Sequence, residues 1–285
     1  MHRRNGNFPA VAEQNELQKR YLFGAFAAAV LLWLTVQTAF FHPDAENTAP
    51  AVPEDGLTVL VEEQYPPFSY ADEKGELKGF DVEVAQGICR ELGTACRIRP
   101  VQFERIIPLL EAGEADLAVA GMGMTPERRE KLAFSEVYYR SRSFFITRDP
   151  DVGLITSANC RGLSIGVQAG TVQAASLAGV FEPLGAKVRT YEDFPAVIRA
   201  LEEGEVSAVL TDGLPGYSFL KSPEGERFYI GGSVDDIESS LTQARVTALR
   251  TRSSLIGAVN RAIESLKEKG DYQVLNLRYF SFINY

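Results

Sequence analysis

The chain has 285 residues, of which 45% are hydrophobic and 24% charged, so it can form one large or two ordinary globular domains. A net charge of −9 argues against nucleic-acid binding, which requires a basic surface. The only histidines are His2 and His42, and both precede the predicted globular part. We therefore expect no metal site and no cofactor.

The N-terminus has the pattern of a membrane anchor. Residues 1–20 are polar and rich in Lys and Arg, and residues 21–41 (YLFGAFAAAVLLWLTVQTAFF) carry no charge over about the length of a bilayer core. The positive-inside rule places residues 1–20 in the cytoplasm and the remainder on the periplasmic or extracellular side. The alternative is a cleaved signal peptide with Ala49–Pro50–Ala51 as its cleavage site. Both readings export the rest of the chain, and the long span favours an anchor in the cytoplasmic membrane.

A linker rich in Pro, Ala and acidic residues follows at 42–55. From Leu57 onward, short apolar runs alternate with helical periodicity. The first series comprises a strand at 57–61, a helix at 81–92, a strand at 96–102, a helix at 104–111 and a strand at 116–120. This order predicts a parallel sheet covered by helices.

A second, similar series follows an extended crossing at 142–148. It comprises a strand at 163–170, a helix from 171, a strand at 186–191, a helix at 194–203, a strand at 206–212 and a short helix to about 220. The chain closes with a strand at 246–250 and helices at 253–269 and 271–278. The repetition predicts two α/β lobes, residues 56–147 with 243–285 and residues 148–242. A ligand is expected between them, at the C-terminal ends of the strands.

Two segments have the chemistry to hold an anion. In DLAVAGMGMTPER (116–128) an apolar run ends at Gly121 and Gly123, where backbone can approach a ligand, and Arg128 has a fork that can grip a carboxylate. Its alternative is a strand end with a surface arginine. In the second lobe Gly170 and Thr171 begin a helix, whose free N–H groups attract anions. Together the two segments would clamp one carboxylate when the lobes close.

Other strand ends offer further polar and aromatic groups. Asp212 ends a strand and suits an ammonium group, although it also suits a helix N-cap. Aromatic surface comes from Tyr65, Phe68 and Phe103, and polar strand ends come from Glu62 and Gln168. No nucleophile–base pair, dinucleotide fingerprint or phosphate loop is present, so catalysis is not predicted.

The three cysteines are interpretable because export permits disulfides. Cys89 lies late in a predicted helix and Cys96 opens the next strand, so a short disulfide is geometrically reasonable. Cys160 is then left over, and we expect it to be a partly buried free thiol.

Several motifs now agree in order and spacing with a known family. They are YPPFSY (65–70), GFDVEVAQGICREL (79–92), FERIIPLLEAGEADLAVAG (103–121), TPERREKLAFSEVYY (125–139) and GVQAGT (166–171). Residues 55–285 resemble the type 3 extracellular solute-binding proteins, the periplasmic receptors for polar amino acids in ABC importers. The resemblance implies a two-lobed periplasmic-binding-protein fold of type II, no enzymatic activity, an amino-acid ligand and an ABC permease as partner.

The resemblance also implies roles for single residues. Arg128 would hold the ligand α-carboxylate, with backbone N–H groups of Gly170 and Thr171 on the same group, and Asp212 would take the α-ammonium. The remaining roles are aromatic contacts from Tyr65 and Phe103, an acid for basic ligands at Glu62, a variable side-chain position at Gln168 and a disulfide between Cys89 and Cys96.

Gly123 departs from the family, which usually has Ser or Thr there to contact the ligand's amino end. The lost hydroxyl should weaken binding by about 1 kcal/mol, or it indicates a ligand without an α-amine. Gly121 remains a position of close backbone approach. Two alternative functions on the same fold stay open for this chain: a dehydratase resembling the cyclohexadienyl dehydratases, which act on prephenate or arogenate, and a membrane-tethered ligand sensor.

Overall fold

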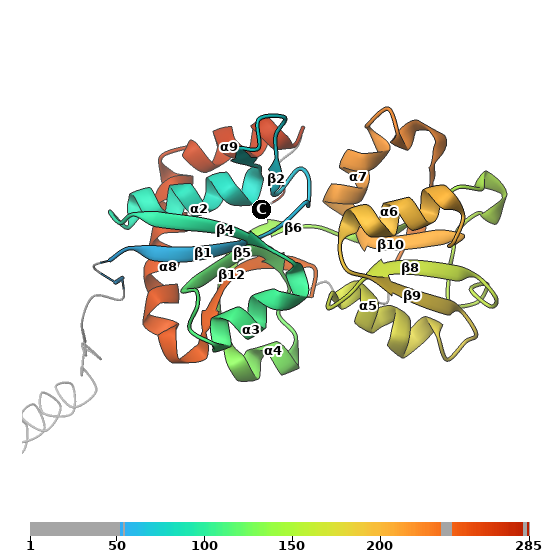
Figure 1. The fold of residues 1–285 in the computed structure, drawn as a ribbon, viewed down its shortest axis with the longest axis horizontal. Helices are drawn as coiled ribbons and strands as arrows, with labels where there is room; N and C mark the ends of the chain where they lie inside the picture. Colours follow the sequence, from blue (N-terminus) through green and yellow to red (C-terminus); the bar gives the residue numbers. More distant parts are fainter. Residues whose placement is uncertain (1–51, 54, 235–240, 282–283, 285) are drawn as a thin grey trace, which may run out of the picture. The chain divides into compact units, whose positions relative to one another are not determined.

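The computed structural model describes residues 52–53, 55–234, 241–281 and 284, all within one compact unit that spans Pro50–Tyr285. The unit contains two five-stranded sheets, each with its own helices, which form the two expected lobes (Figure 1). The predicted segments 1–20 and 21–41 and most of the predicted linker lie outside the described residues. Within the described part of the chain, no helix is long and apolar enough to cross a bilayer.

The first sheet has the strand order β4-β1-β5-β12-β6. Its strands are β1 (Leu57–Glu62), β4 (Cys96–Val101), β5 (Leu117–Met122), β6 (Leu132–Arg140) and β12 (Gln243–Leu249). β1 lies parallel to β4 and β5, whereas β12 lies antiparallel to β5 and β6. The predicted parallel pairing is confirmed for β1, β4 and β5. The rest of the sheet is antiparallel, because β6 leads the chain out of this lobe and β12 brings it back.

The second sheet has the order β11-β7-β10-β8-β9. Its strands are β7 (Ser143–Thr147), β8 (Ser164–Gln168), β9 (Lys187–Tyr191), β10 (Ala208–Asp212) and β11 (Tyr229–Ser233). β10, β8 and β9 are parallel, and β7 pairs antiparallel with both β10 and β11. Ser143–Thr147 thus belongs to the second sheet, on the other side of the lobe boundary expected after residue 147.

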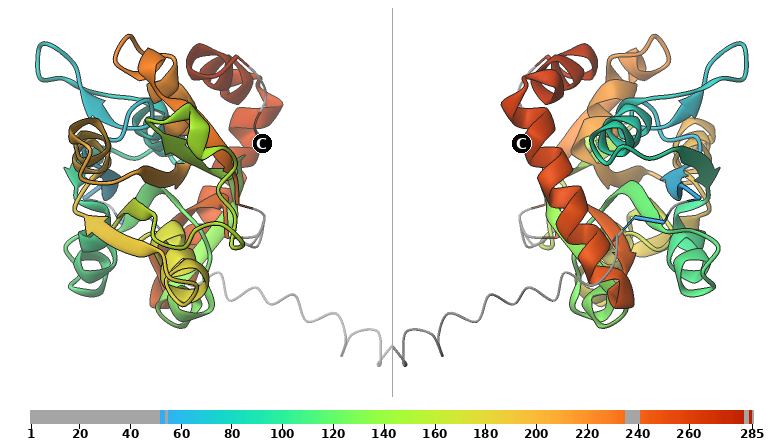
Figure 2. Two further views of the ribbon diagram at one scale, coloured as in Figure 1. Left: turned by 90° about the vertical axis from the view of Figure 1, so that its right-hand side faces the viewer. Right: turned by 90° about the vertical axis from the view of Figure 1, so that its left-hand side faces the viewer.

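Helices cover both sheets and bring their N-termini to the strand ends. The first lobe carries α2 (Phe80–Glu91), η1 (Phe103–Arg105), α3 (Ile106–Glu111), α4 (Pro126–Lys131), η5 (Arg250–Arg252), α8 (Ser253–Glu268), α9 (Asp271–Tyr279) and the ribbon β2 (Tyr70–Ala71) with β3 (Leu77–Lys78). The second carries η2 (Pro150–Val152), α5 (Val172–Ser176), the π-helical turn η3 (Leu177–Phe181), α6 (Phe194–Glu203), α7 (Gly213–Leu220) and η4 (Gly225–Arg227). In Figure 2, α8 runs along one side of the first lobe. Its apolar stripe, including Leu255, Val259 and Ile263, is buried where the helix packs against α2 and β6.

The disulfide between Cys89 and Cys96 is confirmed. It joins the end of α2 to the start of β4, with the two Cα atoms 6.1 Å apart. Cys160 is a free, fully buried thiol in the core of the second lobe. The disulfide sits at the N-terminal end of β4, whereas the candidate site lies at the C-terminal strand ends.

Reducing this disulfide is expected to lower stability without changing ligand affinity. Closing a loop between residues seven apart in sequence removes entropy from the unfolded chain, an effect of about 2–3 kcal/mol. Urea unfolding of the C89A/C96A double variant, compared with the oxidised protein, measures the loss in the free energy of unfolding. An unchanged unfolding midpoint would mean that the disulfide contributes no net stability.

Candidate ligand-binding site

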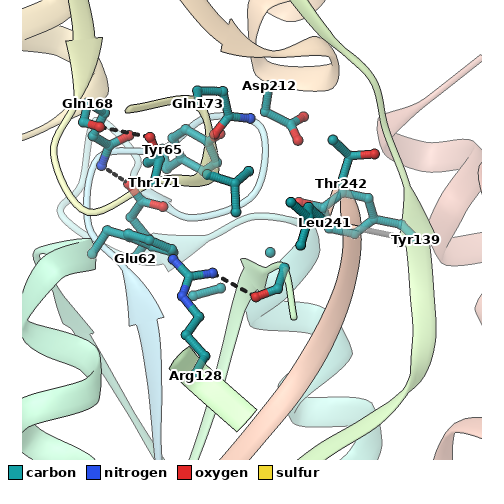
Figure 3. A pocket seen from close by; sticks show the side chains of 15 residues that line it. Glu62, Tyr65, Arg128, Tyr139, Gln168, Thr171, Gln173, Asp212, Leu241 and Thr242 are labelled. Carbon is teal, nitrogen blue, oxygen red and sulfur yellow. Dashed lines mark hydrogen bonds between the residues drawn. The ribbon is translucent and has the colours of Figure 1, made fainter. Parts of the chain in front are cut away.

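A narrow cleft lies between the strand ends of the two lobes (Figure 3). Its lining residues are Glu62, Tyr65, Phe103, Ala120, Gly121, Gly123, Arg128, Tyr139, Gln168, Thr171, Val172, Gln173, Asp212, Leu241 and Thr242. The structure therefore gathers all the predicted ligand residues here except Gly170, which touches the site through Arg128. The cavity that remains is small, about 30 Å³, because side chains of both lobes meet across the cleft.

Arg128 is held in the cleft by the start of α4. The Thr125 hydroxyl caps this helix by accepting the Arg128 backbone N–H at 3.2 Å. The guanidinium donates through Nη1 to the Gly123 carbonyl at 2.7 Å and through Nη2 to the Gly170 carbonyl, in the other lobe, at 2.8 Å. Its Cζ also lies 5.5 Å from the centre of the Phe103 ring.

The charge of Arg128 is not paired directly with a carboxylate among the described residues. Burial lowers the pKa of Arg128 to about 10. A guanidinium with this pKa remains protonated at neutral pH. A half-buried cation that contacts two carbonyl groups and a ring face gains from an added carboxylate, and its planar fork can bind one with two bonds.

The helix start at Gly170–Thr171 lies on the facing lobe. Gly170 has φ +72°, a left-handed conformation that lets β8 turn into α5. The Thr171 hydroxyl accepts the Ala174 N–H at 3.1 Å and donates to the Gln168 carbonyl at 2.8 Å. The N–H groups of a first helical turn have no acceptor within the helix, so this end of the cleft favours an anion.

Asp212 ends β10 and caps α7. Its Oδ1 accepts the Ser141 hydroxyl at 2.7 Å and the Leu214 N–H at 3.1 Å, while Oδ2 accepts no hydrogen bond from the described residues. Burial raises the pKa of Asp212 to about 6, and the two hydrogen bonds oppose that rise. At neutral pH the residue is largely a carboxylate with one open oxygen, which suits an ammonium group.

Glu62 and Gln168 join the two lobes at the other side of the cleft. Gln168 Nε2 donates to Glu62 Oε1 at 2.5 Å, from the last residue of β8 to the last residue of β1. Burial raises the pKa of Glu62 to about 8; the hydrogen bond from Gln168 opposes this, and the nearby carboxylates of Asp193 and Asp212 add to it. Near neutral pH most of the Glu62 side chains therefore carry a proton.

This raised pKa predicts a pH-dependent stability of the protein without ligand. The folded pKa of Glu62, about 8, lies above its value of about 4.3 in an unfolded chain. The stabilisation is thus complete below about pH 4 and is lost as the pH rises through about 8, with a fall of a few kcal/mol in the free energy of unfolding. Urea unfolding at a series of pH values should show this decline, and Glu62→Gln should make it less steep; burial also raises the pKa values of Asp81 and Asp212, which keep their share of the decline. Equal slopes for the two proteins would contradict the raised pKa.

The aromatic side chains divide between cleft and core. Tyr65 and Phe103 line the cleft, as predicted. Phe68 is fully buried and stacks on Tyr139, with ring centres 4.9 Å apart, so it supports the site from the core. Tyr65 also packs edge-on against Phe194 of α6, with ring centres 5.7 Å apart.

Six lining residues were not predicted: Ala120, Tyr139, Val172, Gln173, Leu241 and Thr242. Val172 and Gln173 follow Thr171 at the helix start and could have been inferred from it. Leu241 and Thr242 precede β12 on the returning crossing, where no local pattern marks them. Gly121 has φ +59°, and a Cβ there would lie 2.3 Å from the Tyr139 hydroxyl oxygen, so this glycine makes room for a side chain of the protein.

The chain is also similar to known proteins in sequence and in structure. A family model described as bacterial extracellular solute-binding proteins, family 3, matches residues 57–282. The chain is 30% identical to the arginine-binding periplasmic protein of Mannheimia haemolytica, over 75% of this chain and 87% of the relative. It is 29% identical to the L-cystine-binding protein TcyJ of Escherichia coli (strain K12), over 93% and 96%. A solved structure of an ancestral arginine-binding protein bound to arginine matches with a TM-score of 0.74 and 28% identity, covering 79% of this chain and 98% of that one.

Proposed function

Since the chain belongs to family 3 of the bacterial extracellular solute-binding proteins, we propose that it captures an α-amino acid with a cationic side chain between its lobes, for ABC-type import. The observation that carries the proposal is Arg128, a half-buried cation that forms no ion pair with a carboxylate of the described residues and faces the helix start at Thr171 from the opposite lobe. Both groups suit one carboxylate, and Asp212 supplies the opposite charge for an α-ammonium.

The contacts explain why binding requires lobe closure. The carboxylate would bind Arg128 from the first lobe and the N–H groups at Thr171 and beyond from the second, while the ammonium would bind Asp212 of the second lobe. Only the closed arrangement offers the whole set. In that exchange the carboxylate takes over the bond that Arg128 makes to the Gly170 carbonyl.

A count of charges favours a cationic side chain. A zwitterionic amino acid neutralises Arg128 and Asp212, which leaves Glu62 as the remaining acid in the cleft. A guanidinium or ammonium on the ligand side chain would pair with ionised Glu62 and offset its burial. The arginine-binding relatives fit this class, whereas the L-cystine-binding relative shows that the family scaffold accepts other side chains.

The test is a binding screen with the full-length chain in detergent. Thermal shift followed by titration calorimetry would cover the standard amino acids, L-ornithine and L-cystine, with L-arginine expected among the strongest ligands. Absence of binding across the set would refute the proposal. Binding of neutral amino acids but not of L-arginine or L-lysine would refute only the cationic side chain.

The raised pKa of Glu62 fits an alternative function, that of a dehydratase. Glu62, with a pKa raised to about 8, is a protonated acid inside a carboxylate-binding cleft near neutral pH, as a general acid for a dehydratase would be. The relatives named above are binding proteins, which supports the non-enzymatic function. Incubation with prephenate decides the matter, because formation of phenylpyruvate would establish the dehydratase.

We also propose that the protein is anchored in the cytoplasmic membrane. Residues 21–41 would hold the two-lobed part at the outer face of the cytoplasmic membrane, close to an ABC permease. The mass of the chain recovered from membranes tests this, since cleavage after residue 51 would leave a shorter, unanchored protein.

A further inference from the structure

The two crossings between the lobes meet next to Asp212. β6 pairs with β12 so that Arg140 lies opposite Gln243. One residue further along each crossing, the Ser141 N–H donates to the Thr242 carbonyl at 3.3 Å. The Ser141 hydroxyl donates to Asp212 Oδ1 at 2.7 Å. Ser141 therefore fixes the positions of Thr242 and Asp212 relative to each other.

The returning crossing also explains the glycine at position 123. A Cβ on Gly123 would lie 1.9 Å from the Leu241 carbonyl oxygen and 2.9 Å from its carbon. Real Cβ atoms do not approach backbone so closely, so any side chain at position 123 would push the crossing away. The backbone of Leu241 thus occupies the space where a serine or threonine side chain of Gly123 would begin.

Thr242, the next residue, lines the same cleft. Figure 3 shows it on the side of the cleft where Asp212 lies, away from Gln168 and Glu62. An ammonium group has three N–H donors, and Asp212 Oδ2 can accept one of them. A second acceptor in this part of the cleft would complete the recognition of the group.

We propose that Thr242 is that acceptor: its hydroxyl binds the ligand α-ammonium beside Asp212 and replaces the side chain that Gly123 lacks. The inference rests on the proposed function and makes it more specific, because it assigns an α-amine to the ligand. The hydroxyl reaches the site from the crossing rather than from the strand end of β5.

The test compares two variants and two ligands by titration calorimetry of the full-length chain. Thr242→Val keeps the shape but loses the hydroxyl, and Thr242→Ser keeps the hydroxyl. The ligands are L-arginine and 5-guanidinopentanoic acid, which is arginine without its α-amino group. We expect Thr242→Val to weaken L-arginine about tenfold and the des-amino compound less than about twofold, while Thr242→Ser stays near wild type.

The other outcomes would overturn the inference alone or the proposed function as well. Equal weakening of both ligands by Thr242→Val would indicate a structural role and overturn the inference. An unchanged affinity for L-arginine in that variant would overturn it too, but would leave the proposed function standing. Failure of the wild-type protein to bind L-arginine would overturn both.

A second pair of variants tests the spatial argument independently. Gly123→Ser restores a hydroxyl at the strand end but displaces the Leu241 backbone, so it should weaken L-arginine by more than about tenfold. Gly179→Ser is the matched control, since a Cβ at that exposed glycine meets no atom within 4 Å. Tighter binding of L-arginine by Gly123→Ser would show that the Leu241 backbone can move aside without loss of the site. It would overturn the assignment of Thr242.

Discussion

Replacement of Arg128 by alanine is expected to weaken L-arginine binding by more than about 100-fold. In the proposed complex the half-buried guanidinium binds the ligand carboxylate, and two hydrogen bonds between charged groups are together worth about 3 kcal/mol or more. Arg128→Lys should also bind weakly, because an ammonium cannot reproduce the planar fork. Calorimetric titration of each variant with L-arginine gives the affinities.

Arg129→Ala is the matched control for this experiment. Arg129 follows Arg128 on α4 but is exposed to solvent, so its loss should change the affinity by less than about twofold. Thermal unfolding without ligand checks that both variants fold. Retention of affinity within about fivefold in a folded Arg128→Ala protein would mean that the carboxylate is bound elsewhere.

Raising the pH from about 6 to about 9 is expected to strengthen L-arginine binding by up to about 100-fold. In the proposed complex the cationic side chain pairs with ionised Glu62, whose pKa without ligand is about 8. Below that pH, binding must release the proton, so the affinity falls as the pH falls; above it, the affinity levels off. Asp212, with a pKa of about 6, adds a smaller change of the same sign at the acidic end.

The variant Glu62→Gln separates this effect from general changes with pH. A neutral amide does not titrate, so its affinity for L-arginine should be low and nearly flat over the same range, apart from the contribution of Asp212. Calorimetry in buffers of different ionisation enthalpy also counts the protons released on binding. An affinity that declines as the pH rises from about 6 to 8 would exclude the pairing of a cation with Glu62.

Local patterns predict most elements of the fold, and the reasons are visible in single residues. The helix at 194–203 has the expected bounds because the Asp193 side chain accepts the Ala196 N–H at 2.7 Å at one end. At the other end, Gly204 adopts φ +79° and stops the helix. Such caps lie within a few residues of the elements that they end.

The antiparallel strands depend on distant partners instead. β6 and β11 were not predicted, and β11 (YIGGS) contains two glycines that give it little strand propensity of its own. It forms by pairing with β7, more than eighty residues earlier in the sequence. The direction of β12 likewise follows from the route of the chain between the lobes, which no local pattern records.

The residues of the candidate site also fall into two groups: those that local patterns predict and those that distant pairing places. Arg128, Thr171 and Asp212 could be predicted because each stands where a strand ends and a helix begins. Tyr139 and Thr242 could not, since their position in the cleft depends on the pairing of two crossings about a hundred residues apart. Gly123 is the clearest example of what the sequence alone does not reveal. In the sequence this glycine indicates only that a hydroxyl is missing. In the structure the Leu241 backbone occupies the space that a side chain at position 123 would need.

Two hydrogen bonds between the lobes occupy side chains that the ligand would bind, so they compete with the ligand for these side chains. The Gly170 carbonyl holds Arg128 and the Gln168 amide holds Glu62, the two side chains that would bind opposite ends of an amino acid. A fragment such as acetate or guanidinium ion can replace only one of these bonds, and the other still resists opening. A molecule with both charges at the correct spacing replaces the two together. From these two contacts we expect the protein to bind whole amino acids in preference to their fragments.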